Sequence, residues 1–325
     1  MLQHLTDSRQ LSRAWMETEL FPLCDSLRNN MGVGKPLAGR ALYGLFYEPS
    51  FLTRTSFERA MSLMGGQAQF TEDASQFFPV STSSYVENTI KFLASLHFDV
   101  VVLRSNWPGA IAAAAGANAL SVINGGSDFD HPTQALLDIY TLRRELGGVD
   151  GIRIAVVGRV DHRNVNALLM ALTRYENVQV KLVPITGAVN PEVLEYCQDT
   201  GVTMSQESSL TPFASELDAI YVNGAETALH TQLMLSRDLV NVKIDEELLQ
   251  RLTPNCVILD PMQRTEPLIT CNGDHRLAGY RQAENGLFVR MALLQLLMGS
   301  PGPQQTQLGD HAALGFDRIA PWPGK

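Results

Sequence analysis

The chain has 325 residues, of which 45% are hydrophobic and 18% are charged, as in soluble globular proteins and unlike disordered ones. This length accommodates two domains of ordinary size, each with its own core. The net charge of −9 argues against a broad nucleic-acid-binding surface, which needs clustered lysine and arginine. No membrane-spanning apolar run and no signal-peptide pattern occurs, so we expect a cytoplasmic protein without a membrane partner.

The cysteines are scattered along the chain and include no Cys-x-x-Cys pair. This spacing favours free thiols over a disulfide framework or a zinc site. The four positions are Cys24, Cys197, Cys256 and Cys271.

Strand and helix patterns alternate through the first half of the chain. Helices are expected over residues 11–27, 51–64, 86–96 and 107–117, and strands over residues 37–47, 99–103 and 119–123. Residues 76–84 are expected to form a loop. Alternating strands and helices imply right-handed crossovers and a parallel sheet.

The most informative stretch is residues 124–146, which contains the segment His-Pro-Thr-Gln. Asn124 and two glycines are expected to end a buried strand, and Pro132 suits the first turn of the following helix. His131 and Gln134 are three residues apart at the start of that helix, where free N–H groups and the helix dipole favour an anion. This arrangement suits a polarised carbonyl beside a phosphate, although a capped helix with a polar first turn is the simpler reading of His-Pro alone.

A glycine-rich segment at residues 146–151 is the expected domain boundary. We therefore expect an α/β protein with two doubly wound parallel-sheet domains, residues 1–147 and 148–282. A helix at residues 283–298 is expected to pack back on the first domain, and residues 299–325 are expected to form a surface arm. The strand-to-turn step at Gly158 lacks a G-x-G-x-x-G pattern, which argues against a dinucleotide site.

Three polar residues each follow an expected strand of the first domain. They are Ser50, Arg104 and His131. Ligands of parallel sheets gather at the carboxyl ends of the strands, so these side chains are expected to converge there.

Four features follow one another along the chain: the segment containing Thr-Arg-Thr-Ser-Phe-Glu, then Arg104, then HPTQALLD and finally AENGLFVR. With these motifs the chain resembles the aspartate/ornithine carbamoyltransferase family, nearest to the aspartate branch, over about residues 38–299. The resemblance implies a carbamoyl-phosphate domain, an amino-acid domain and homotrimers with shared active sites. It also implies that no metal or organic cofactor takes part: an amine attacks the carbamoyl carbon and phosphate leaves.

The same resemblance assigns roles to individual residues. Arg104, His131 and Thr53 fall where the family polarises the carbonyl, and Gln134 falls where it holds the carbamoyl nitrogen. Arg163 falls where the aspartate branch grips an acceptor carboxylate. The positions that bind the phosphate or carbamoyl group are Ser50, Phe51, Leu52, Thr53, Arg54, Met262 and Gln263.

The phosphate loop departs from the family pattern. In the register without gaps, Leu52 replaces the arginine that grips the phosphate, and Arg54 matches a second, more structural arginine. A register shifted by two residues would return Arg54 to the phosphate, but it needs an insertion and a compensating deletion.

The acceptor side departs as well. Ser81 and Thr82 align with a Ser-Lys loop that the neighbouring subunit donates, so its lysine is missing. Gly224 replaces an arginine that binds the α-carboxylate, and Glu226 places a carboxylate near the expected amine. The family's Pro-Leu-Pro turn has become Pro261 followed by Met, Gln and Arg, so a rearranged loop is expected there.

Two functions remain open from the sequence. The first is a carbamoyltransferase-like enzyme that uses an acceptor other than ordinary aspartate, because Arg104, His131, Gln134, Thr53 and Arg163 are all present. The second is a catalytically silent relative with a structural or regulatory role, because the arginine and lysine positions at Leu52, Thr82 and Gly224 are lost together.

Overall fold

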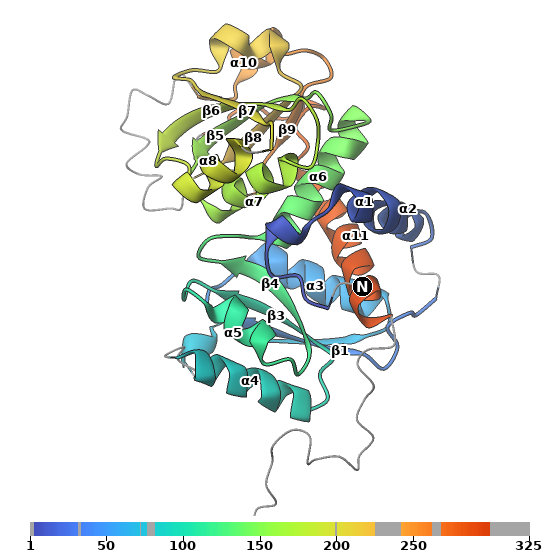
Figure 1. Ribbon diagram of the computed structural model, residues 1–325. Helices are drawn as coiled ribbons and strands as arrows, with labels where there is room; N and C mark the ends of the chain where they lie inside the picture. Colours follow the sequence, from blue (N-terminus) through green and yellow to red (C-terminus); the bar gives the residue numbers. More distant parts are fainter. Residues whose placement is uncertain are drawn as a thin grey trace, which may run out of the picture.

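The computed structural model describes residues 3–31, 34–71, 73–76, 82–198, 200–224, 242–261 and 268–299. Within these residues the chain forms two α/β domains, one above the other in Figure 1, with α6 and α11 running where they meet. No helix in the described part is long and apolar enough to cross a membrane.

The first domain has a four-stranded parallel sheet in the order β2-β1-β3-β4. Its strands are β1 (Ala41–Phe46), β2 (Gln67–Thr71), β3 (Val100–Ser105) and β4 (Ser121–Ser127). Its helices are η1 (Ser8–Gln10), α1 (Arg13–Trp15), η2 (Met16–Leu20), α2 (Phe21–Asn29), α3 (Phe51–Leu63), η3 (Ala74–Gln76), α4 (Ser83–Ser95), α5 (Ala110–Gly116) and α6 (Pro132–Leu146).

The second domain has a five-stranded parallel sheet in the order β7-β6-β5-β8-β9. Its strands are β5 (Arg153–Arg159), β6 (Gln179–Thr186), β7 (Thr203–Gln206), β8 (Ala219–Asn223) and β9 (Val257–Leu259). Its helices are α7 (Arg163–Leu172), α8 (Pro191–Gln198), η4 (Thr211–Glu216) and α10 (Glu246–Arg251), and α11 (Gly279–Met298) follows them.

Both sheets are covered on both faces, which confirms the predicted doubly wound α/β class. In β3, Val100 and Val102 face the core beneath α3 and α6, whereas Val101 and Leu103 face α4 and α5. Successive residues of a strand point to opposite faces, so a strand that is apolar throughout needs cover on both sides. The second sheet divides its strand residues in the same way between α7 and α8 on one face and η4 and α10 on the other.

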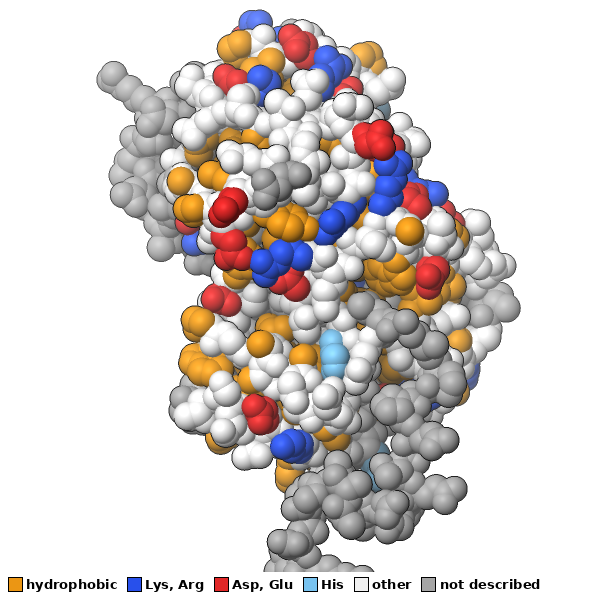
Figure 2. All heavy atoms as spheres, in the orientation of Figure 1, with side chains coloured by type: hydrophobic (Ala, Val, Ile, Leu, Met, Phe, Trp, Pro, Cys, Tyr) orange, Lys and Arg blue, Asp and Glu red, His pale blue; other side chains and the backbone are white. Residues whose placement is uncertain are grey.

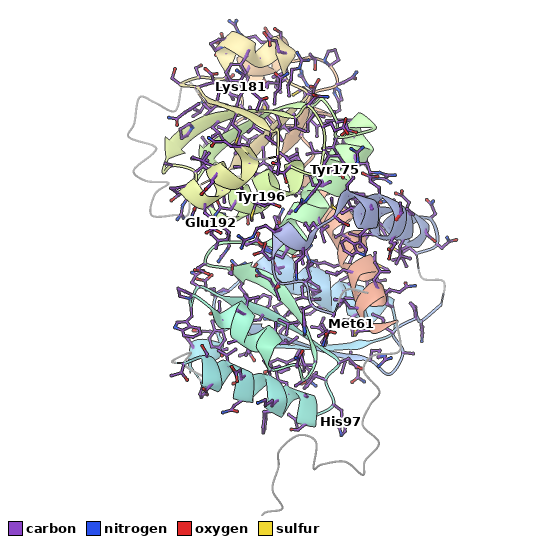
Figure 3. The ribbon with its side chains drawn as sticks, in the orientation of Figure 1. Met61, His97, Tyr175, Lys181, Glu192 and Tyr196 are labelled. Carbon is purple, nitrogen blue, oxygen red and sulfur yellow. The ribbon has the colours of Figure 1, made fainter. Side chains whose placement is uncertain are left out.

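Helix α11 and the N-terminal segment join the two domains. Helix α11 packs against α2, α3 and α6 of the first domain, alongside α3 in Figure 1. Leu5 pairs with Ile123 of β4, while Arg9 forms an ion pair of 2.7 Å with Glu192 of the second domain. Figure 3 shows Glu192 and Tyr196 on the side of the second domain that faces the first.

One strand boundary differs from the prediction at a place that matters for the site. Strand β4 does not end at residues 124–126 but continues through them to Ser127. The Asn124 side chain explains the difference, since its Oδ1 accepts from the Gly126 N–H and its Nδ2 donates to the Thr6 carbonyl. The four cysteines are free and buried, as predicted.

Candidate active site

The polar residues that follow the strands of the first sheet meet where the two domains face each other. Arg104 is the penultimate residue of β3, and His131 is the residue before α6. Gly126 lies between them with a φ of 121°, and a Cβ there would lie 2.6 Å from Nη1 of Arg104 and 3.5 Å from Nε of Arg163. Because glycine leaves this space open, two guanidinium groups occupy it.

Glu48, which follows β1, holds these two arginines beside each other. Its Oε2 accepts from Nη2 of Arg163 at 3.0 Å and lies 3.8 Å from Nε of Arg104. Arg163 also donates to the Ser127 carbonyl and to Asn106, both at 2.7 Å. Arg163 opens α7 of the second domain, so this side chain ties the two domains together. Figure 2 shows acidic and basic side chains side by side across the middle of the molecule.

The His131 ring is buried, with 3% of the residue exposed. Burial, followed by the positive charges of Arg104 and Arg163, lowers the pKa of His131 well below its ordinary value. The imidazole is therefore neutral at physiological pH. Its Nδ1 lies 3.4 Å from the hydroxyl of Thr133. In the tautomer in which Nδ1 accepts a hydrogen bond from this hydroxyl, Nε2 carries the N–H of the neutral ring.

Gln134 belongs to a buried hydrogen-bond network centred on Asp138, one helical turn further along α6. Nε2 of Gln134 donates to Oδ1 of Asp138 at 2.9 Å, and Nε2 of Gln282 donates to the same atom at 2.7 Å. The Tyr221 hydroxyl donates to Oδ2 at 2.8 Å. Since the Gln134 NH₂ group donates a hydrogen bond to Asp138, Oε1 of Gln134 is the atom left to accept a hydrogen bond from a substrate N–H.

The first turn of α3 lies at the carboxyl end of β1, as predicted. Ser50 is the N-cap residue, but its hydroxyl makes no capping bond, and Thr53 is buried. Arg54 donates to Glu58 at 3.1 Å, and its guanidinium lies 5.9 Å from the centre of the Phe70 ring. Arg54 therefore contacts a neighbour on its own helix, and its predicted structural role stays a prediction.

The side chains of Phe51 and Leu52 lie in the wall of a cavity beside the site. Both line an apolar cavity next to Gln134, and 69% of Phe51 is exposed. The first turn of α3 thus presents hydrocarbon to this cavity.

Only part of the predicted acceptor side lies in the described residues. Thr82 is the N-cap of α4 and accepts from the Tyr85 N–H at 3.2 Å. Gly224 is buried just beyond β8. The remaining predicted residues fall outside the described residues: Ser81, Glu226, Met262 and Gln263.

Glu48 and Asp138, which hold Arg163 and Gln134, are not among the residues predicted from the sequence. Glu48 lies shortly after the end of β1, so the rule that gave Ser50 could have identified it. Asp138 lies four residues after Gln134 on one face of the helix, a spacing that brings side chains together.

This fold and site define a two-domain α/β protein with a basic site between its domains. A family model for the carbamoyl-phosphate-binding domain of aspartate/ornithine carbamoyltransferases matches residues 3–144, and the model for the Asp/Orn-binding domain matches residues 150–297. The chain belongs to the aspartate/ornithine carbamoyltransferase family.

Individual relatives agree with this assignment. The chain is 36% identical to a chloroplastic aspartate carbamoyltransferase of Oryza sativa subsp. japonica over 82% of this chain and 75% of that protein. It is 34% identical to the aspartate carbamoyltransferase catalytic subunit of Pyrobaculum neutrophilum, over 81% and 88% respectively. A Trypanosoma cruzi aspartate transcarbamoylase solved with N-(phosphonacetyl)-L-aspartic acid has a TM-score of 0.81 at 30% identity, covering 90% of this chain and 94% of that one.

Proposed function

We propose that this chain is an enzyme that transfers a carbamoyl group from carbamoyl phosphate to the amine of an amino-acid-like acceptor. The observation that carries the proposal is the pair Arg104 and Arg163 at Gly126, with His131 close enough for both charges to lower its pKa, in a chain that matches both family domains. The acceptor nitrogen attacks the carbamoyl carbon, the carbon–oxygen bond to phosphate breaks, and the acceptor nitrogen loses a proton.

The proposed roles follow from the donors and acceptors of each group. Nε2–H of neutral His131 and the guanidinium of Arg104 donate to the carbonyl oxygen, which gains negative charge as the amine attacks. Oε1 of Gln134 accepts from the carbamoyl NH₂, because its own amide protons are directed to Asp138. Thr53 adds a hydroxyl donor from the first turn of α3.

The phosphate would rest on the start of α3, where free backbone N–H groups and the Ser50 hydroxyl can donate to it. We propose that backbone groups of residues 51 to 53 and of residues 262 and 263 complete this cradle, whereas the Arg54 N–H donates to the Ser50 carbonyl at 3.2 Å. With Leu52 in place of an arginine, one charge-assisted hydrogen bond of roughly 1.5–3 kcal/mol is absent. Carbamoyl phosphate should therefore bind more weakly than in relatives that keep this arginine.

For the acceptor we propose Arg163 as the carboxylate-binding residue, with residues 224 and 226 shaping the rest of the site. Ser81 and Thr82 would come from a neighbouring subunit. The relatives named above are aspartate carbamoyltransferases, which makes aspartate the first acceptor to test. We propose that the preferred acceptor differs from aspartate, since Gly224 lacks a guanidinium and leaves room for a larger or cationic group.

The test is phosphate release from carbamoyl phosphate with a panel of amines, aspartate included. His131→Ala and Arg104→Ala should each lower kcat by about 10²–10³-fold, the usual cost of losing an oxyanion donor. Arg54→Ala serves as the matched control, because Arg54 pairs with Glu58, and it should change kcat far less. If no amine supports phosphate release and no phosphorylated ligand binds, the chain is instead a silent homologue with a structural role.

We also propose a homotrimer in which neighbouring chains share active sites. The support is family membership together with the position of Thr82 at the start of α4, away from the residues around Gly126 in sequence. Sedimentation equilibrium should give three times the chain mass of 35.7 kDa. A monomer that turns over carbamoyl phosphate would contradict shared sites.

A further inference from the structure

A cavity of about 450 Å³ opens beside Gln134, and its mouth is flanked by exposed aromatic residues. It lies where the starts of α3 and α6, the end of β9 and the first half of α11 meet. We call it the Arg290 cavity. Its apolar walls include Phe51, Leu52, Leu137, Ile258, Ile269 and Leu277. At the rim, 69% of Phe51 and 86% of Tyr280 are exposed.

Arg290 reaches the wall of this cavity from α11 although only 3% of the residue is exposed. Its Nε has no hydrogen-bond partner, and no ion pair to its guanidinium occurs in the described part of the chain. The guanidinium lies 5.3 Å from the centre of the Phe57 ring, which covers one face of it. Burial, opposed by the negative charge of Asp138, lowers the pKa of Arg290 to about 10, so the side chain still carries its charge at neutral pH.

A buried charge without a partner is costly, and folded proteins pair nearly all such groups. The other polar side chains of the wall do not meet this need. The amides of Gln134 and Gln282 are bonded to Asp138, and Asp274 is paired with Arg276 at 2.7 Å. The charge of Asp138 acts on Arg290, but in the described part of the chain no carboxylate lies within ion-pair distance of the guanidinium that lines the cavity.

The surroundings of Arg290 select among possible anions. A guanidinium matches one carboxylate through two parallel hydrogen bonds. A phosphate dianion would need further cationic donors, whereas the remaining charged groups of the wall are the carboxyl groups of Asp260 and Asp274. Hydrocarbon walls favour a ligand whose remainder is apolar.

We propose that the Arg290 cavity binds a small monocarboxylate with an apolar body. Its carboxylate lies against the guanidinium of Arg290, and its apolar part fills the space between Leu52, Leu137 and Leu277. This site shares Phe51, Leu52 and Gln134 with the proposed carbamoyl site, but Arg290 and the walls from β9 and α11 belong to it alone. Binding can be measured whether or not the chain transfers carbamoyl groups.

The test is isothermal titration calorimetry of the full chain with 3-phenylpropionate, which has a phenyl group and one carboxylate. We expect one site per chain. The matched neutral amide, 3-phenylpropanamide, should bind at least about tenfold more weakly, because it loses the charge-assisted bonds. Acetate should also bind at least about tenfold more weakly, because it lacks the apolar body. Equal binding of acid and amide, or no binding of the acid, overturns the proposal.

Two variants localise the binding. Arg290→Met removes the charge and should abolish binding, while its Tm should equal or exceed that of the parent chain because an unpaired buried charge is gone. Ala283→Trp lies at an exposed position of the wall and should block the cavity, whereas Glu284→Trp, the next residue and outside the wall, should bind as the parent does. A large loss of Tm in Arg290→Met would show that Arg290 is structural. Unchanged binding in Ala283→Trp would show that the probe binds elsewhere.

Discussion

Asp138 is the residue on which the most buried hydrogen bonds of the site converge. Its carboxyl group accepts from Gln134, Gln282 and Tyr221, which come from α6, α11 and β8. Burial is the largest influence on this group and raises its pKa to about 7, while the hydrogen bonds oppose that shift. The orientation of Gln134 therefore depends on a carboxyl group that titrates near neutral pH.

This titration predicts a measurable pH dependence of stability. The folded state holds the Asp138 proton up to about pH 7, whereas the unfolded carboxyl releases it near its ordinary value of 3.8. The free energy of unfolding contributed by this group is thus greatest at low pH and falls as the pH rises through this interval. Between pH 5 and pH 8 the loss should be on the order of 2–3 kcal/mol, and Asp138→Asn should lack it.

The measurement is the free energy of unfolding in urea at several pH values for the parent and Asp138→Asn. Asp130 provides a matched control, because burial raises its pKa only to about 6. Asp130→Asn should differ in slope from the parent up to about pH 6 and run parallel to it only above about pH 7. A parent and Asp138→Asn pair with parallel curves from pH 5 to 8 would mean that Asp138 does not titrate there.

At the scale of elements, the site depends on the last residues of β4. This strand continues through Gly125 and Gly126, and the missing Cβ of Gly126 makes room for Arg104. The side chain of Arg104 then donates to the Gly125 carbonyl at 3.1 Å. The end of the strand and the position of the guanidinium are therefore set by the same two glycines.

Gly126→Ala should displace the guanidinium of Arg104 from its position beside residue 126. The new Cβ would stand 2.6 Å from Nη1 of Arg104, so the side chain must move, and affinity for carbamoyl phosphate should fall by at least about tenfold. Backbone strain of about 1–3 kcal/mol should also lower the Tm. Gly147→Ala is the control, because Gly147 also has a positive φ of 79° but no atom lies within 4 Å of its added Cβ. If both variants bind alike, the clash with Arg104 does not matter.

The elements that could be predicted from sequence are those with a strong apolar pattern or a distinct start. Helix α6 begins at Pro132 as predicted, because proline and the stripe after it define the first turn. Strands β2 and β7 have no such pattern: both lie at sheet edges, and their sequences, QAQFT and TMSQ, are mostly polar. Edge strands need only partial cover, so hydrophobicity alone does not identify them.

The site itself could be predicted only in part, for a related reason. Residues after strands converge by topology, and this rule gave Ser50, Arg104 and His131. Arg290 is buried without an ion pair in the described part of the chain because of the side chains that pack around α11. No local pattern in AENGLFVR predicts which side chains those are. Likewise the use of Thr82 as a helix cap is visible only with its partner, the Tyr85 N–H.

At the scale of the whole molecule, the two domains are joined by contacts of very different burial. Arg163 of α7 bonds to Glu48, Ser127 and Asn106 of the first domain, and only 10% of its side chain is exposed. The Arg9–Glu192 ion pair also bridges the domains, but 41% and 60% of these side chains are exposed. Exposed pairs contribute little, because water and salt screen them.

Glu48→Gln should therefore loosen the domain junction, whereas Glu192→Gln should not. The substitution keeps an oxygen acceptor but removes the charge that Arg163 and Arg104 share, at a cost of roughly 1.5–3 kcal/mol for a charge-assisted bond. Small-angle X-ray scattering should report a larger radius of gyration for Glu48→Gln than for the parent. The KM for the acceptor should rise as well, because Arg163 loses the partner that orients it. A radius of gyration that is unchanged in Glu48→Gln, or increased equally in Glu192→Gln, would show that the buried bridge does not hold the domains together.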